Sequence, residues 1–447
     1  CDLKQFDRAL EVYRLAAAGE SNALYAEKAK CLALVHLKDM DGATDAVWRM
    51  MLDFSRDARM PLAAVQVGDA FLKAKQPEVA VEIYRYVVDH HAGSDAAVWA
   101  QKNICDMLID AGDEAGTAMA IDKLKTHFDA RQTVAAALLQ LADKYRGLKA
   151  VDDARLLCKH VIDEYTDTAS PLWAAQRLIL IDIDESEDPN APLETIPPPI
   201  LAAVDRLRTD YAIHPELTKA LFYIGEEYYR MGHYDDFGRV RPTGKLYWPK
   251  AIAVWQKLLN GDVPFDREFT PEAWWLTGVC QARMAQAPQA LSSLQTVIKN
   301  WPEFKFAWNA QVWIGVCYEQ LKRANRRKPK MDYDALIEEA YATVLEKYPD
   351  CTMVFLANLK LAELKYEQGR WEESAMHAER YLADKYIAHS AQRAGVLYKL
   401  GQCYEKMGEP DVARTVYQQH LTEFPDDKLP THSKVLARLA AVNGGEQ

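Results

Sequence analysis

The sequence lacks most of the patterns that identify an enzyme, a metalloprotein or a membrane protein. Its eight cysteines are scattered singly among 447 residues, without a CxxC pair or a Cys/His zinc spacing. No uninterrupted apolar stretch reaches the roughly 18 residues that span a bilayer. GxSxG, glycine-rich dinucleotide turns and EF-hand loops are missing. We therefore expect a protein that is not an enzyme, has no transmembrane segment and holds no cofactor and no metal.

Two weak metal candidates do not change this expectation. His160 and Glu164 lie one helical turn apart but do not form HExxH. His90 and His91 lie at the predicted end of a helix, where an imidazole suits the negative end of the helix dipole.

A glycine-lysine step in residues 233–250, HYDDFGRVRPTGKLYWPK, raises the question of a phosphate-binding loop. A Walker-type loop needs four residues between its glycines and a hydroxyl residue after the lysine. Here five residues separate Gly238 from Gly244, and Leu246 follows Lys245. The stretch is therefore not interpreted as a phosphate site.

Length and charge favour an elongated protein that does not bind nucleic acid. A single compact core rarely grows past about 300 residues, so this chain is several domains or an array. Its net charge of −11 argues against a general nucleic-acid binder, which would carry a basic face. The chain is rich in aromatic residues, with 22 Tyr and 11 Trp.

A repeat runs through most of the chain. Residues 397–425, LYKLGQCYEKMGEPDVARTVYQQHLTEFP, align with FYIGEEYYRMGHY at 222–234 through a shared Gly-x-x-Tyr-x-x-x-Gly spacing. This pattern resembles the tetratricopeptide repeat, a unit of about 34 residues that forms two antiparallel helices. Units start at Leu24, Pro61, Val98, Ala135, Thr218, Pro271, Trp308, Phe355 and Ala394, with a degenerate unit between 170 and 216.

Physical chemistry supports the same frame. A small residue at positions 8 and 20 lets helix A cross helix B closely, and large residues at positions 4, 7, 11 and 24 fill the remaining space. Glycine at position 15 ends helix A in a left-handed turn, and proline at position 32 stops helix B. We predict an all-α, right-handed superhelix of about ten helical pairs with three inter-helix insertions.

The frame divides the chain into two arrays. We predict an N-terminal array over 1–181 whose first repeat is incomplete, and an acidic, proline-rich hinge over 182–199. A C-terminal array follows over 200–429, and residues 430–447 form a capping helix and tail. Further insertions are predicted at 233–250 and 322–333. The aromatic insertion is either a binding loop or a tolerated surface loop, and the basic insertion is interpreted as solvated.

The resemblance implies a concave groove lined mostly by A helices, where a protein or peptide partner binds. Groove positions combine aromatic and basic residues, which are common in binding hot spots, and the first insertion adds more. The predicted partner-binding residues are Lys219, Phe222, Glu226, Tyr229, Arg230, Trp275, Arg283, Arg239, Arg241, Lys245, Tyr247 and Trp248. Later units place Leu356, Leu359, Glu363, Tyr366, Tyr398, Gln402 and Glu405 at the same groove positions.

We expect a non-catalytic scaffold, and the alternative is the accessory region of an enzyme or sensor whose active domain lies upstream of residue 1. The helix-B endings VLEKYP, VIKNWP and HLTEFP are similar to those of bacterial cell-envelope members of the family, which favours a periplasmic or envelope location. A lipid anchor at Cys1 is left open as a minor alternative.

Overall fold

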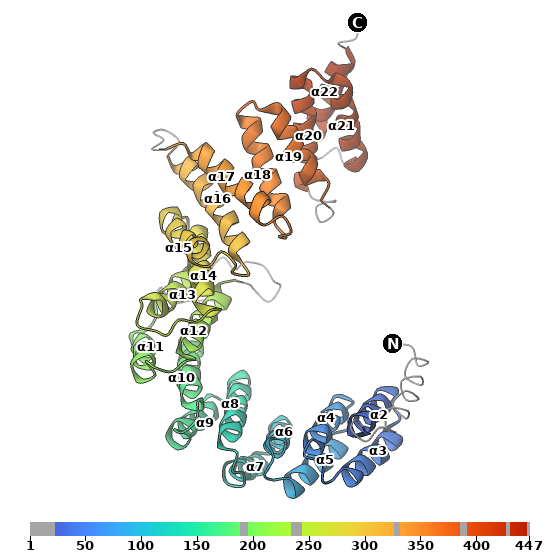
Figure 1. The fold of residues 1–447 in the computed structure, drawn as a ribbon, viewed down its shortest axis with the longest axis vertical. Helices are drawn as coiled ribbons and strands as arrows, with labels where there is room; N and C mark the ends of the chain where they lie inside the picture. The colour runs from blue at the N-terminus through green and yellow to red at the C-terminus, as the bar shows by residue number, and fades with distance from the viewer. Residues whose placement is uncertain are drawn as a thin grey trace. The chain divides into compact units, whose positions relative to one another are not determined.

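The computed structural model describes residues 23–187, 195–233, 244–325, 331–384, 391–425 and 430–444. Every regular element in these ranges is an α-helix. Contacts divide the chain into a first unit of residues 1–188 and 197–211 and a second unit of 189–196 and 212–447. In each unit, consecutive helices form antiparallel pairs that stack on one another (Figure 1). The predicted all-α stack of about ten helical pairs is confirmed.

The described residues of the first unit form five helical pairs. The first helix of each pair is called helix A and the second helix B, as in the repeat frame. The pairs are α2 (Ala23–Leu37) with α3 (Met40–Asp53), α4 (Met60–Lys73) with α5 (Pro77–His90), α6 (Asp95–Ala111) with α7 (Glu114–Thr126), α8 (Arg131–Gly147) with α9 (Val151–Glu164), and α10 (Ser170–Ser186) with α11 (Pro198–Asp210).

The second unit contains five more pairs and a final helix. These are α12 (Leu217–His233) with α13 (Gly244–Leu259), α14 (Phe269–Arg283) with α15 (Ala287–Asn300), α16 (Ala307–Ala324) with α17 (Tyr333–Lys347), α18 (Val354–Glu367) with α19 (Trp371–Leu382), α20 (Ala391–Met407) with α21 (Pro410–Glu423), and lastly α22 (His432–Gly444). Val435 of α22 is buried against Ala413 and Tyr417 of α21, so α22 covers the last pair.

Repeat positions 8 and 24 set how closely the two helices of a pair cross. Where position 8 is glycine, an added Cβ would collide with the large side chain at position 24. The distances are 2.6 Å for Gly68 to Tyr84, 2.3 Å for Gly225 to Trp255, 2.6 Å for Gly278 to Leu294, 2.7 Å for Gly315 to Tyr341 and 2.3 Å for Gly401 to Tyr417. Where position 8 is alanine, position 24 is smaller, as in Ala142 with Cys158 and Ala362 with Ala378.

Position 15 has a left-handed backbone in seven repeats, whether or not it is glycine, whereas Gly232 and Lys322 at this position are still helical because α12 and α16 continue past it. Gly112, Gly369 and Gly408 have φ values of 70°, 73° and 78° at this position. Lys38, Lys75, Lys149 and Ala285 occupy the same position with φ between 60° and 63°. A side chain in this region is strained, so inter-helix packing imposes the turn in these four repeats.

The boundary between the units differs from the predicted one. α10 continues to Ser186, so residues 182–186 are helical and do not belong to a hinge. α11 packs on α10 and belongs to the first unit, although the sequence frame assigned residues from 200 onward to the second array. Residues 188–194 of the predicted hinge lie outside the described residues.

The two predicted insertions in the second array are shorter than expected. α13 begins at Gly244, so the predicted insertion of 233–250 is wrong for 244–250, which are helical. An added Cβ on Gly244 would lie 2.3 Å from the carbonyl oxygen of Gly232, so Gly244 allows the end of α12 to approach α13. Similarly, α16 extends to Ala324, and residues 322–324 of the second predicted insertion are helical.

Candidate functional site

Three of the predicted partner-binding residues are buried and belong to the core. Phe222 of α12 is 3% exposed and lies between Trp255 and Phe269, with ring centroids 6.1 Å and 5.1 Å away. Tyr247 and Trp248 lie in the first turns of α13 and are also buried. The prediction that these three side chains present a surface to a partner is therefore wrong. The hydrophobic pattern of α13 continues one turn earlier than the repeat frame indicated.

Trp275 of α14 mainly joins two neighbouring repeats. Its ring stacks on Phe306 with centroids 4.5 Å apart, and its Nε1–H donates to Oδ1 of Asn309 at 2.9 Å. Both partners lie at the start of the next repeat. The side chain is half-buried, so its largest contribution is to the packing of α14 against α16.

The predicted basic residues each contact different side chains of this protein. Arg230 is exposed and forms an ion pair with Glu227 at 3.4 Å. The Arg283 guanidinium lies over the rings of Trp248 and Trp313, 5.7 Å from each centroid. Lys219 lies over the ring of Phe269 at 5.8 Å.

Lys245 is exposed on α13. Arg239 and Arg241 lie outside the described residues.

Two further predicted groove residues are half-buried on α12. The ring of Tyr229 lies 5.9 Å from that of Trp255. Burial raises the pKa of Glu226; Arg230 opposes this shift, while the nearby carboxylates of Glu272 and Glu227 add to it. Glu226 therefore favours its protonated form more than an ordinary surface glutamate does.

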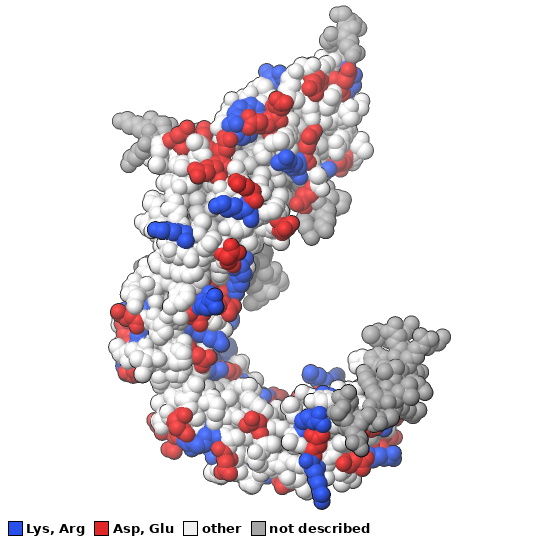
Figure 2. Space-filling model, in the orientation of Figure 1, with Lys and Arg blue, Asp and Glu red and all other residues white. Residues whose placement is uncertain are grey.

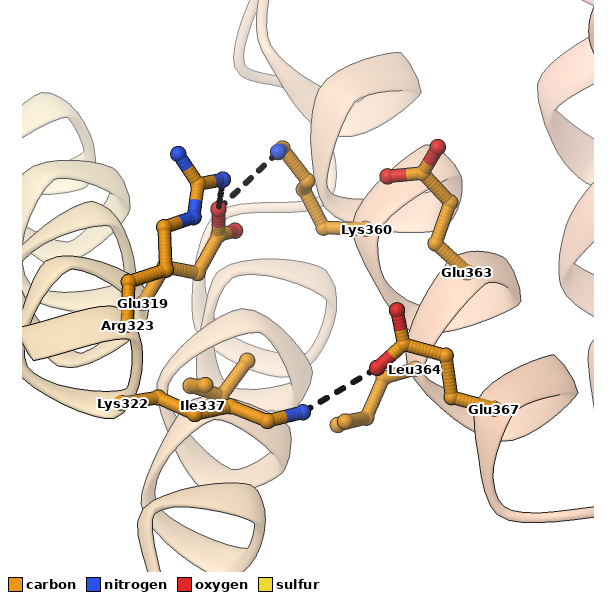
Figure 3. A pocket seen from close by; sticks show the side chains of 8 residues that line it. All are labelled: Glu319, Lys322, Arg323, Ile337, Lys360, Glu363, Leu364 and Glu367. Carbon is orange, nitrogen blue, oxygen red and sulfur yellow. Dashed lines mark hydrogen bonds and ion pairs between the residues drawn. The ribbon is translucent and has the colours of Figure 1, made fainter. Parts of the chain in front are cut away.

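A cavity of about 330 Å³ opens between α16, α17 and α18 (Figure 3). The A helices α12, α14 and α16 approach one another closely in succession, whereas α18 makes few close approaches to α16 or to α20. The lining carries three cations and three anions above an apolar floor. Its residues are Glu319, Lys322, Arg323, Ile337, Lys360, Glu363, Leu364 and Glu367.

Glu319 is the anchor on one side of this cavity. It accepts hydrogen bonds from Lys360 at 3.1 Å, Arg323 at 3.3 Å and the hydroxyl of Tyr341 at 2.8 Å. Burial and the Glu319 charge both raise the pKa of Tyr341, which keeps this hydroxyl protonated as a donor. Arg323 is 77% exposed and contacts only Glu319 among the described residues, so most of its guanidinium donors are free.

Lys322 and Glu363, elsewhere in the lining, form ion pairs with neighbouring helices. Lys322 contacts Asp334 at 2.7 Å and Glu367 at 3.1 Å. Burial lowers the pKa of Lys322, but these two carboxylates outweigh that effect and the net shift is upward. Glu363 reaches Lys399 of the next A helix at 3.4 Å. On the face shown in Figure 2, acidic and basic side chains alternate in the same way over much of the second unit.

Sequence reasoning found part of this cavity. It placed Glu363 at a groove position, but it interpreted Lys322 and Arg323 as part of a solvated basic loop. The signal that α16 continues was present, because Tyr318 and Leu321 keep helical spacing up to these residues. The groove positions Tyr366, Gln402 and Tyr398 do meet: the Tyr366 hydroxyl donates to Gln402 at 2.9 Å, and Gln402 donates to Tyr398 at 3.2 Å.

The described ranges contain neither a metal-ligand cluster nor a membrane-spanning helix. These ranges contain no group of three or more His, Cys, Asp or Glu residues placed to hold a metal ion. No helix among them is both long and apolar enough to cross a membrane. Their cysteines are free thiols, and burial raises the pKa of Cys31, Cys105, Cys158 and Cys317 to about 12.

These features define an all-α repeat protein built from stacked helical hairpins. The tetratricopeptide repeat family model matches residues 272–303 and 396–427, which cover the α14–α15 and α20–α21 hairpins. These two hairpins are therefore tetratricopeptide repeats, and the shared frame at positions 8 and 24 supports the same kind of repeat in the other pairs. Proteins of this family bind protein partners, so the chain is a protein-interaction scaffold.

Solved structures of tetratricopeptide repeat proteins are similar to this chain at low identity. A thermophilic protein from Thermus thermophilus is 16% identical with a TM-score of 0.29, covering 50% of this chain and 98% of its own. A protein from Parabacteroides merdae is 11% identical with a TM-score of 0.30, covering 69% and 98%. The P58(IPK) repeat domain is 12% identical with a TM-score of 0.25, covering 94% and 97%.

Since these TM-scores are low, the family assignment rests on the matched repeats and on their packing. A comparison with curated proteins found no match.

Proposed function

We propose that the A helices of the second unit bind an extended segment of a partner protein, centred on the cavity between α16, α17 and α18. The observation that carries this proposal is the cavity itself, which lies where the close succession of the A helices α12, α14 and α16 ends. Its volume of about 330 Å³ is in the range of sites that take a side chain or a small ligand.

The charges of the lining indicate a segment that carries both signs. Arg323 offers free guanidinium donors on one side, where an acidic side chain of the partner would form a charge-assisted hydrogen bond. Glu363 and Glu367 lie on α18 across the cavity and suit a basic side chain. Ile337 and Leu364 supply apolar contact between these two places.

The exposed and half-buried residues of α12 and α14 extend the proposed surface along the same row of A helices. They are Lys219, Glu226, Tyr229, Arg230 and Arg283. Like the cavity, this part carries charges of both signs, and it adds the ring of Tyr229; an aromatic ring beside an arginine is common in binding hot spots.

The proposal is tested by site-specific photo-cross-linking to the partner. A benzophenone amino acid replaces Glu363 in the proposed surface or Arg85, which is exposed on helix B of the first unit. We expect one defined partner segment to cross-link at 363 and not at 85. Arg323→Glu should weaken capture of that partner by about tenfold or more, because it repels the acidic side chain, while Arg85→Glu should not.

Arg323 is 77% exposed, and Lys360 and Tyr341 still bind Glu319 without it, so Arg323→Glu should lower the melting temperature only slightly. Equal cross-linking at 363 and 85, or normal capture by a folded Arg323→Glu variant, would place the binding surface elsewhere.

We further propose that the partner complex belongs to a bacterial cell envelope. The helix-B endings VLEKYP, VIKNWP and HLTEFP support this by their resemblance to envelope members of the family. Fractionation of the native cells tests it, and recovery of the protein entirely in the cytoplasm would contradict it.

A further inference from the structure

A second cavity, of about 360 Å³, lies between α17, α18 and α19 and shares no lining residue with the first. It is lined by Glu338, Ala342, Leu345, Glu346, Leu361, Lys365, Glu373 and His377. Two of these side chains are polar groups at repeat positions that aliphatic or aromatic side chains occupy in most other repeats. They are Lys365 at position 11 and His377 at position 23.

The equivalents of Lys365 in other repeats show how unusual it is. Position 11 is leucine, phenylalanine or tyrosine in seven of the other aligned repeats, such as Phe71, Tyr228 and Tyr404, and the uncharged Gln281 in the eighth. Lys365 is only 2% exposed, and its ammonium forms ion pairs with Glu338 and, at 3.2 Å, with Glu373. Arg370 binds the same two carboxylates at 2.8 Å and 2.6 Å. Glu338 and Glu373 are therefore already neutralised by protein cations.

His377 presents one ring nitrogen without a partner among the described residues. The side chain is 8% exposed, and its Nδ1 lies 3.0 Å from Oδ1 of Asn358. Asn358 is held in this orientation because its Nδ2 donates to the carbonyl of Val354 at 3.1 Å. Since Oδ1 can only accept, Nδ1 carries the proton and Nε2 is left as an acceptor. Burial and the charges of Arg380 and Lys365 lower the pKa of His377 to about 4, so the ring stays neutral near pH 7.

Glu346 supplies the remaining free charge. It is exposed at the edge of the cavity and forms no ion pair or hydrogen bond with any described residue. The lining thus offers a carboxylate and a neutral imidazole acceptor beside an apolar wall of Ala342, Leu345 and Leu361. These groups suit a cation with an apolar stem.

We propose that this cavity binds the guanidinium group of an arginine side chain from a partner protein. A guanidinium presents several planar donors and is weakly hydrated, so it can satisfy Glu346 and His377 Nε2 at once while its methylene stem lies on the leucines. A lysine ammonium is a compact and strongly hydrated charge that fits this arrangement less well. The site is lined mainly by the B helices α17 and α19, together with one side of α18, and does not depend on the function proposed above.

The test uses the whole protein with histidine rings labelled with ¹³C at Cε1, observed by NMR. The His377 signal is assigned as the one that disappears in His377→Gln. The probe is the peptide acetyl-Gly-Arg-Gly-amide, and acetyl-Gly-Lys-Gly-amide is its matched control. We expect a saturable shift of the His377 signal with the arginine peptide and binding several-fold weaker with the lysine peptide.

Two variants establish where the probe binds. Glu346→Gln removes the free carboxylate and should weaken binding by about fivefold to tenfold, because one charge-assisted hydrogen bond becomes a neutral one. Glu372→Gln changes an exposed glutamate of α19 outside the cavity and should have no effect. The proposal is overturned if the arginine peptide causes no saturable shift, if the lysine peptide binds equally well, or if Glu346→Gln binds normally.

Discussion

Replacing Gly401 with alanine tests whether positions 8 and 24 determine how closely a helical pair packs. The added Cβ would lie 2.3 Å from the ring of Tyr417, which is fully buried. Glycine-to-alanine changes inside a helix normally stabilise by about 0.5–1 kcal/mol through helix propensity. Overpacking a filled core costs about 1–3 kcal/mol. We expect the steric term to exceed the propensity term, with a net loss of about 1–2 kcal/mol.

Gly395 provides a matched control in the same helix. An added Cβ there meets no atom within 4 Å, so Gly395→Ala should stabilise α20 by about 0.5–1 kcal/mol. Because repeat arrays can unfold in parts, the readout is hydrogen exchange of the α20 and α21 amides, supported by urea unfolding. If Gly401→Ala protects these amides as well as Gly395→Ala does, the close contact with Tyr417 does not exist.

A double-mutant cycle then separates the steric effect from other causes. Tyr417→Cys removes the ring and reproduces the pairing of Ala142 with Cys158 in the first unit. In this background Gly401→Ala should no longer be destabilising, so the coupling energy should be about 1–3 kcal/mol. An unchanged cost of Gly401→Ala in both backgrounds would contradict the steric explanation.

Three other predictions follow from the same packing. Trp275→Ala should lower the unfolding free energy by about 2–3 kcal/mol in urea titrations because it removes the stack on Phe306, whereas Arg230→Ala should change it by less than about 0.5 kcal/mol. Lys149→Gly should stabilise by about 0.5–1 kcal/mol because it relieves a left-handed φ of 62°, and a loss would contradict imposed strain. Acid should destabilise the protein through His377. Between pH 6.5 and about 4 the unfolded chain binds a proton at this residue that the folded chain does not bind. Lowering the pH through this range should therefore reduce the unfolding free energy by up to about 3 kcal/mol. His377→Gln should remove this part of the slope in urea titrations across that range, and an identical slope would assign it to other groups.

The repeat frame was predictable from sequence because each of its positions has one local physical requirement. A small residue is needed where the helices cross, and the side chain at position 24 fills what that residue leaves empty. The sequence carries both halves of this relation, as in Gly401 with Tyr417. Position 15 was predictable in conformation even at Lys75 or Ala285, because the register of the repeat determines where the turn falls.

The candidate sites were less predictable because they depend on how neighbouring repeats differ. Groove positions were assigned by register alone, which cannot show that Phe222 is covered by Phe269 or that Tyr247 belongs to α13. Helix ends caused the same difficulty: the frame ended α16 near Tyr318, so Arg323 was assigned to a loop. The distance between α16 and α18 depends on the packing of several helices, so it could not be predicted from any single residue of the sequence.

Departures from the frame indicate sites better than the groove positions do. A charged or polar group in a core position costs stability unless other groups compensate for it. In the repeat that starts at Phe355, two core positions hold Lys365 and His377, and the compensation requires Glu338, Glu373 and Asn358 around them. Apolar residues of similar volume at positions 11 and 23 would pack there without this network, as Phe71 and Ile83 do in the repeat that starts at Pro61. Polar residues at these positions do not by themselves indicate a site, because Gln281 and Ser293 occupy them in the repeat that starts at Pro271 and satisfy each other through a hydrogen bond of 2.9 Å. The repeat that starts at Phe355 differs because its polar residues line a cavity and because Nε2 of His377 has no partner among the described residues, which is the acceptor that the proposed arginine would use.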